Sequence, residues 1–176
     1  MMTEGMKRVL FLDFDGVLNT EKYQEKLRLE GEPRWDDFGQ LFDPKAVENL
    51  KMILDAVPDV LLVISSSWKL EGLDRMKALW EARGLPGTVH GVTPDYVPDL
   101  LDINQADPDN MAMLAGKGNE VKEWLSRFAP DGCKYVILDD VPDFLPEQEA
   151  FLICTDPRAG ITHNVAVRVI SLLKSL

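Results

Sequence analysis

The sequence is short of cysteine and of positive charge. Its two cysteines, Cys133 and Cys154, stand inside or beside apolar runs, and no secretory leader is visible. We therefore expect reduced core thiols in a cytoplasmic protein rather than a disulfide framework. Lysine and arginine number 19 against 30 aspartates and glutamates, which gives a formal net charge of −11. This balance argues against a general affinity for nucleic acid or for anionic membranes.

Long hydrophobic runs, internal repeats and low-complexity linkers are missing as well. No apolar run approaches the ~20 residues needed to span a bilayer, so we expect no membrane partner. A chain of 176 residues that is 45% hydrophobic is typical of one globular domain with a proper core. We therefore expect a single domain over residues 1–176.

Short apolar runs alternate with helical patterns along the chain. Because the runs are apolar throughout and helices separate them, we expect an α/β fold with a parallel sheet covered on both faces. Asp43 and Thr162 are expected to cap the first and last helices of this pattern at their amino ends. The expected strands cover 9–14, 59–64, 87–92, 134–138 and 150–154, and the expected helices cover 43–58, 70–84, 119–128 and 162–173.

Polar side chains follow the expected strands. Asp13, Asp15 and Gly16 follow the first strand, and the sequence SSSWK at 65–69 follows the second. The strand KYVIL is followed by an acidic group, while Lys117 precedes the helix that leads into that strand. Ligands of an open parallel sheet bind beyond the carboxyl ends of its strands, so we expect these groups to meet at one edge.

Carboxylates, hydroxyls and one ammonium are the groups needed to move a phosphoryl group. An acidic cluster suits Mg²⁺, which would offset the repulsion between a phosphate and an attacking carboxylate. A serine hydroxyl and Lys117 can hold the phosphate oxygens. One aspartate can act as nucleophile while its neighbour acts as general acid and then as base. Gly16 would let the backbone approach the ligand closely.

Four motifs resemble those of the haloacid dehalogenase (HAD) superfamily of phosphohydrolases. They are DFDGVLN at 13–19, ISSSWK at 64–69, KGNEVKEWL at 117–125 and YVILDD at 135–140. The match is similar in detail to the small HAD domains found alone or in RNA-repair proteins. The resemblance implies a three-layer, doubly wound, Rossmann-like sandwich with a mainly parallel central sheet and only a small cap or flap at 20–42.

The resemblance also implies roles for individual residues. Asp13 would be the nucleophile that becomes an aspartyl phosphate, and Asp15 the general acid and base. Ser65 matches the phosphate-binding hydroxyl because it directly follows the apolar run, with Ser66 as the alternative. Lys117 matches the basic residue of the third motif, which is more often arginine in the closer relatives.

The metal site implied by the resemblance holds Mg²⁺. Asp139 would bind the ion together with Asp13 and the backbone carbonyl of Asp15. Either Asp140 or Asp143 would complete the set of ligands, because the fourth motif fits both spacings.

Functions of other classes are disfavoured by the order and presence of these residues. A signalling receiver domain places paired acids first and its phosphorylated aspartate in the middle of the chain, unlike this sequence. A decayed HAD domain kept as a binding module would have lost the nucleophile or the acid, and both are present. Asp15 argues against dehalogenases and phosphonatases, which lack an aspartate there.

The substrate is less well defined by the sequence. The acidic composition favours a small phosphate ester or nucleotide, while the RNA-repair resemblance favours a polynucleotide end or another open substrate such as a phosphoprotein. In the segment 20–42, aromatic residues and cations would contact the leaving group or merely cover the sheet edge. These residues are Lys22, Tyr23, Lys26, Arg28, Arg34, Trp35 and Phe38.

Overall fold

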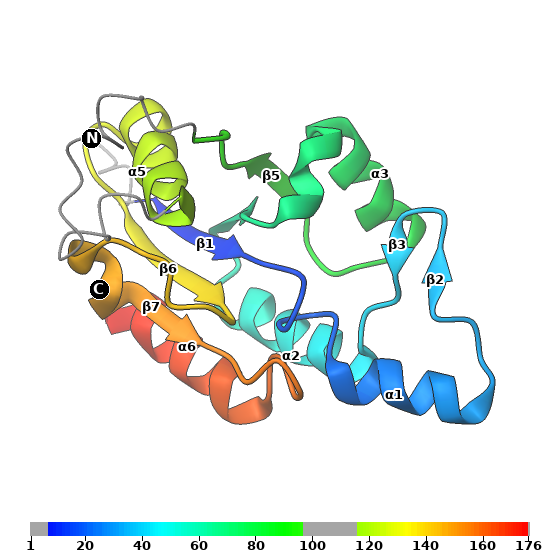
Figure 1. Ribbon diagram of the computed structural model, residues 1–176. Helices are drawn as coiled ribbons and strands as arrows, with labels where there is room; N and C mark the ends of the chain where they lie inside the picture. Colours follow the sequence, from blue (N-terminus) through cyan, green and yellow to red (C-terminus); the bar gives the residue numbers. More distant parts are fainter. Residues whose placement is uncertain (1–6, 97–115, 176) are drawn as a thin grey trace, which may run out of the picture.

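The computed structural model describes residues 7–96 and 116–175 (Figure 1). Its centre is a five-stranded sheet in the order β5-β4-β1-β6-β7, in which every pairing is parallel. The strands are β1 (Arg8–Leu12), β4 (Val60–Ile64), β5 (Val89–Val92), β6 (Lys134–Asp139) and β7 (Leu152–Cys154). The expected α/β fold with a parallel sheet is confirmed.

Helices cover both faces of this sheet. Helices α2 (Pro44–Ala56) and α6 (His163–Ser175) pack side by side on one face, with α3 (Leu73–Ala82) beside β5 (Figure 1). Helix α5 (Gly116–Phe128) packs on the other face. The architecture is therefore the three-layer, doubly wound sandwich that the HAD resemblance implies.

The alternation of side chains along β1 divides the core in two. Leu10 and Leu12 pack with buried residues of α2, α3 and α6, whereas Val9 and Phe11 point to the α5 side. There the Phe11 ring meets Trp124 of α5 edge-on, with 5.3 Å between the ring centroids. Because β1 is buried on both faces, its sequence is a continuous apolar run rather than an alternating one.

Two helix caps are placed as expected. The Asp43 carboxylate accepts a hydrogen bond from the Lys45 amide at the start of α2, and the Thr162 hydroxyl accepts one from Val165 at the start of α6. Asp43 also accepts a hydrogen bond from the Thr20 hydroxyl, which ties the start of α1 (Glu21–Glu30) to α2. These caps satisfy amide groups that have no partner inside the helix.

Some expected boundaries were wrong. The helix expected over 70–84 is divided at Gly72 into the 3-10 helix η1 (Ser67–Glu71) and α3, because Gly72 has a positive φ of 90°. The last strand begins at Leu152, since the residues before it form the 3-10 helix η3 (Pro146–Phe151). Strand β1 ends at Leu12 rather than at residue 14.

The segment 20–42 forms α1 followed by the short hairpin β2 (Trp35–Asp36) and β3 (Gly39–Gln40). Arg83, which follows α3, holds this hairpin through a 2.7 Å ion pair with Asp36 and a hydrogen bond to the Gly39 carbonyl. The acidic stretch at 93–116, whose sequence is typical of a loop, lies mostly outside the described residues.

Both cysteines are free thiols, as expected, but Cys154 is exposed rather than part of the core. It is the last residue of β7, which is an edge strand of the sheet formed by the described residues. Within residues 7–96 and 116–175, no helix combines the length and apolar character needed to cross a membrane.

Candidate active site

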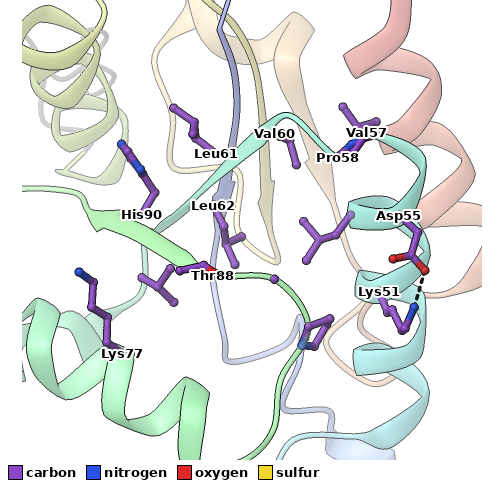
Figure 2. Close-up of a pocket in the computed structure, with 14 residues that line it drawn as sticks. Lys51, Asp55, Val57, Pro58, Val60, Leu61, Leu62, Lys77, Thr88 and His90 are labelled. Carbon is purple, nitrogen blue, oxygen red and sulfur yellow. Dashed lines mark hydrogen bonds and ion pairs between the residues drawn. The ribbon is translucent and has the colours of Figure 1, made fainter.

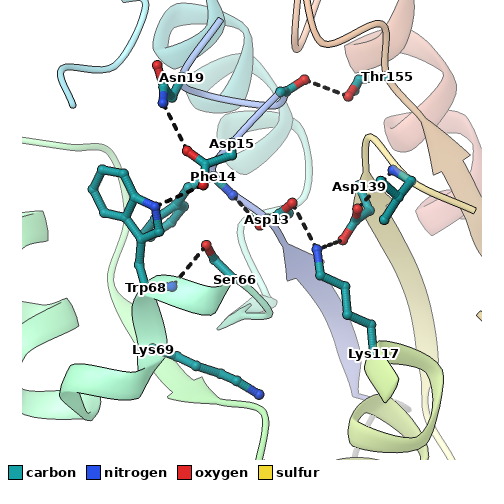
Figure 3. Close-up of polar contacts among 12 residues, drawn as sticks. Asp13, Phe14, Asp15, Asn19, Ser66, Trp68, Lys69, Lys117, Asp139 and Thr155 are labelled. Carbon is teal, nitrogen blue, oxygen red and sulfur yellow. Dashed lines mark hydrogen bonds and ion pairs between the residues drawn. The ribbon is translucent and has the colours of Figure 1, made fainter. Parts of the chain in front are cut away.

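The register of the sheet brings the polar strand ends together. Leu12 at the end of β1 pairs with Ile64 of β4 on one side and with Leu138 of β6 on the other. The next residues along the three strands are Asp13, Ser65 and Asp139, so they lie at the same carboxyl edge, and Figure 3 shows Asp13 and Asp139 there. The backbone hydrogen bonding between β1 and β6 extends one residue past the end of β1, because the Asp13 amide donates to the Leu138 carbonyl at 3.1 Å.

Lys117 of α5 joins two of these acids. Its Nζ lies 2.9 Å from Asp13 Oδ2 and 2.7 Å from Asp139 Oδ2 (Figure 3). The second oxygen of each carboxylate accepts a backbone amide, from Phe14 for Asp13 and from Val141 for Asp139. Both aspartates are buried, so these hydrogen bonds and the ammonium replace the water that the carboxylates have lost.

The position of Lys117 depends on close packing of the first turn of α5. The Gln148 side chain donates to the Gly118 carbonyl and accepts from the Leu145 amide. A Cβ on Gly118 would lie 2.7 Å from the Leu145 nitrogen, so only glycine allows this approach. This close packing directs the side chain of Lys117, at the start of the turn, towards the end of β6.

A second, buried cation fixes α5 one turn further along. Lys69 of η1 is 7% exposed, and its Nζ lies 2.7 Å from the Glu120 carboxylate of α5. It also donates to the Thr93 hydroxyl and to the Pro94 carbonyl, beyond the end of β5. Lys69 was not among the expected site residues, although a lysine directly after the serine-rich turn was a signal for it.

Three carboxylates form a group that fits a divalent cation. Asp13, Asp139 and Asp140 each offer an oxygen within 4.8 Å of the others. When all three carboxylates are ionised, the ammonium of Lys117 leaves this group with two negative charges, and its oxygen ligands are those that Mg²⁺ prefers. Asp143, the alternative to Asp140, is exposed and does not belong to this group.

Gly16 makes room for Asp140. A Cβ on Gly16 would lie 2.3 Å from Asp140 Oδ2, and the residue has a positive φ of 74°. The missing side chain of Gly16 thus admits the Asp140 carboxylate, and the close approach of a ligand to this glycine stays a prediction. The Gly16 carbonyl is in turn fixed by the Thr155 hydroxyl at 2.8 Å, a contact that reading the residue after β7 would have suggested.

Burial and mutual repulsion set the charge state of the acids. Burial raises the pKa of Asp13 above 3.8, although Lys117, the Phe14 amide and a hydrogen bond from Ser66 oppose the rise. Burial and then the neighbouring Asp13 raise the pKa of Asp139 to about 7. Burial would lower the pKa of Lys117, but Asp13 and Asp139 outweigh it and raise that pKa, so the ammonium stays charged.

Asp15 lies apart from these carboxylates and is held by two side chains. Asn19 Nδ2 donates to its Oδ1 at 2.9 Å, and the indole Nε1 of Trp68 donates to its Oδ2 at 3.0 Å (Figure 3). The Trp68 ring packs against Phe14 and Phe42. The indole hydrogen bond to Asp15 was not anticipated.

Both candidate serines are buried at this edge. Ser65 Oγ has no hydrogen-bond partner, while Ser66 Oγ accepts a hydrogen bond from the Trp68 amide and its hydroxyl lowers the pKa of Asp13. The hydroxyls of Ser65 and Ser66 are therefore both placed at the carboxyl edge that holds Asp13.

A cavity of about 420 Å³ opens beside Asp15. Its walls come from elements around the end of β1, from α1 and β3, and from two later loops: Asp15, Gly16, Asn19, Thr20, Glu21, Gln24, Gln40, Asp140 and Pro157. The cations and aromatic residues considered for the leaving group are not among its lining residues. Figure 2 shows a larger cavity of about 660 Å³ at the amino ends of β4 and β5, which shares no residue with the site.

One protein family matches the chain, the HAD domain in Swiss Army Knife RNA repair proteins, over residues 9–166. The chain belongs to this family. HAD domains are generally hydrolases of the phosphatase type, and the matched span of this HAD domain includes Asp13, Asp15, Lys117 and Asp139. No curated protein and no solved structure matches the chain.

Proposed function

We propose that this HAD domain is a Mg²⁺-dependent phosphatase that hydrolyses phosphate monoesters through an aspartyl phosphate on Asp13. The observation that carries the proposal is the contact between the buried Asp13 carboxylate and Lys117, within a group of acids that fits a divalent cation. Lys117 would pair with a phosphate oxygen, and a hydroxyl of Ser65 or Ser66 would hydrogen-bond another.

The proposed reaction has two steps, formation of the aspartyl phosphate and its hydrolysis. A carboxylate oxygen of Asp13 attacks phosphorus, and the bond between phosphorus and the leaving oxygen breaks as Asp15 gives that oxygen a proton. Asp15 then takes a proton from water, which attacks the phosphorus of the acyl phosphate and releases inorganic phosphate and free Asp13. Asn19 and Trp68 keep the Asp15 carboxylate in place for both transfers.

Asp13, Asp139 and Asp140, together with the backbone carbonyl of Asp15, would hold the Mg²⁺ ion. When bound, the ion supplies positive charge that offsets the repulsion between the phosphate and the attacking carboxylate. Lys117 alone leaves the acid group with an excess of negative charge, which is why a cation cofactor is part of this proposal.

Segment 20–42 is proposed as a small flap beside the site. Gln40 of β3 accepts a 2.6 Å hydrogen bond from Asn19, which in turn holds Asp15. Trp35 is 51% exposed and Arg34 stacks on its ring. Neither side chain lines the cavity beside Asp15. The part of the flap that would meet a leaving group is thus its inner side, with Gln24 and Gln40.

Our proposal for the substrate class is based on the acidic composition of the chain. We propose a small phosphate ester or nucleotide, with a polynucleotide end as the alternative that the RNA-repair family favours. A non-catalytic binding module is the alternative of another class. Retention of both Asp13 and Asp15 at the carboxyl edge supports catalysis instead.

The test is a phosphatase screen with Mg²⁺ across sugar phosphates, nucleotides, and 3′- and 5′-phosphorylated oligonucleotides. We expect turnover that EDTA stops and that Asp13→Asn reduces by about 10⁴-fold or more, because an amide cannot form the intermediate. Asp143→Asn is the matched control, since this exposed acid lies outside the carboxylate group and should retain activity. Undiminished turnover by Asp13→Asn protein would refute the mechanism.

A further inference from the structure

The cavity beside Asp15 is the place where a leaving group would lie, and this inference rests on the phosphatase function proposed above. Asp15 would give its proton to the leaving oxygen, so the leaving group must extend from the phosphate on the Asp15 side. The cavity of about 420 Å³ adjoins both Asp15 and Asp140. Its volume is in the range of small-molecule sites.

The walls of this cavity carry acids and amides. The amides are Asn19, Gln24 and Gln40, and the acids include Glu21 of α1. Among the described residues that line the cavity, none is lysine, arginine or histidine. If a metal ion neutralises Asp140 and Asp15 holds a proton, Glu21 still leaves the cavity with a negative charge and with no cation.

The cations near the cavity do not offset the negative charge of its walls. Arg158 lies 3.9 Å from the Glu21 carboxylate, but both side chains are more than half exposed, and Arg158 is outside the lining. Lys22 and Lys26 of α1 are exposed and are not lining residues. A phosphate in the cavity would therefore lose water without gaining a cation to replace it.

Hydrogen-bond acceptors are in excess in these walls. The amide Nδ2 of Asn19 already donates to Asp15 and Gln40, while its Oδ1 is buried without a partner, and Asn19 is only 6% exposed. Gln24 repeats this pattern, because its Nε2 donates to the Leu41 carbonyl and its Oε1 is buried without a partner. Amide and carboxylate oxygens are matched by a ligand that brings O–H donors.

We propose that the leaving group of the substrate is uncharged and rich in hydroxyl groups, as in a sugar or a nucleoside, and that a second phosphate on it is rejected. The enzyme would then prefer monophosphates to the corresponding bisphosphates. A polynucleotide end would be a poor substrate for the same reason, because its nearest internucleotide phosphate belongs to the leaving group.

The test compares substrates that differ only by a phosphate on the leaving group. The pairs are fructose 6-phosphate with fructose 1,6-bisphosphate, and adenosine 3′-monophosphate with adenosine 3′,5′-bisphosphate, and p-nitrophenyl phosphate reports on the phosphate site alone. We expect kcat/KM to be about fivefold or more higher for the monophosphate of any accepted pair, from the Coulomb repulsion between charges several ångströms apart. Equal or reversed values would overturn the inference, as would hydrolysis of p-nitrophenyl phosphate alone.

Charge reversal at Glu21 tests the source of the preference. Glu21→Lys should lower the ratio of monophosphate to bisphosphate kcat/KM by about fivefold. Glu25→Lys is the matched control, because Glu25 is exposed on the same helix and does not line the cavity, so its ratio should not change. An equal shift in both variants would show a general charge effect and overturn the role of the cavity. If the wild type with Mg²⁺ hydrolyses neither p-nitrophenyl phosphate nor any substrate of the phosphatase screen, the proposed function fails and this inference falls with it.

Discussion

The folded protein disfavours the ionised form of the Asp139 carboxyl group. Burial and the nearby Asp13 raise its pKa to about 7, and Lys117 offsets only part of this effect. Between pH 4 and pH 7 the unfolded chain has therefore released a proton that the folded protein still holds. The folded state binds more protons in this range, so rising pH favours unfolding.

We therefore expect the metal-free protein to lose stability relative to Asp139→Asn as the pH rises from about 4 to 7. Above the pKa of about 7 the difference should become constant. The asparagine cannot ionise, and its side-chain oxygen can still accept from the Val141 amide. Urea unfolding of both proteins at several pH values in EDTA measures the difference. A difference that is independent of pH would contradict the assigned charge state.

The positions of the buried site acids could be predicted from the sequence because these acids stand at strand ends. Asp13 and Asp139 follow apolar runs, so their meeting follows from a parallel sheet. The choice between Asp140 and Asp143 depends on the path of the loop after β6, and the space for Asp140 depends on the missing side chain of Gly16. Neither feature is visible in hydrophobic periodicity.

The buried pair of Lys69 and Glu120 joins two elements that carry site residues. Lys69 lies three residues after Ser66, and Glu120 lies three residues after Lys117. Their side chains are 5% and 15% exposed, so both charges depend on each other and on a few polar neighbours. Removing one partner of such a pair leaves a buried charge without compensation.

We expect Lys69→Met to lower the free energy of unfolding by about 3 kcal/mol. Adding Glu120→Gln should recover part of this loss, because the buried carboxylate is then gone. Lys51→Met is the control, since its pair with Asp55 is exposed on α2 and should cost less than about 0.5 kcal/mol. Urea denaturation measures all of these values. Equal small losses at both lysines would show that burial adds nothing to the pair.

Whole elements were easier to predict than their ends. The strands and long helices follow from apolar runs and 3.6-residue periodicity, because each buries one face or two. The break at Gly72 and the 3-10 helix before β7 were missed, since both depend on local backbone geometry that the apolar pattern does not encode. The hairpin of β2 and β3 was missed because each strand has only two residues.

The molecule as a whole carries a net charge of −11, so any salt will screen its internal repulsion. Specific binding of Mg²⁺ must be separated from this general effect. We expect Mg²⁺ to raise the unfolding temperature beyond the effect of sodium chloride at equal ionic strength, because a ligand that binds only the folded state stabilises it. Thermal unfolding with each salt measures this excess, and Asp139→Asn should remove most of it. The same excess in the variant would place the ion elsewhere.

The central position of β1 also determines when the site can form during synthesis. Arg8 pairs with Val60 and with Lys134, so the first strand of the sheet waits for partners from much later in the chain. Asp13 and Asp139 are separated by roughly 10 seconds of translation at ordinary rates. Until the end of β6 has left the ribosome, the nascent chain has Asp13 and, in its last stage, Lys117, but it still lacks the partner acid Asp139. A chain interrupted before that point cannot bind or cleave a phosphate by the chemistry proposed above.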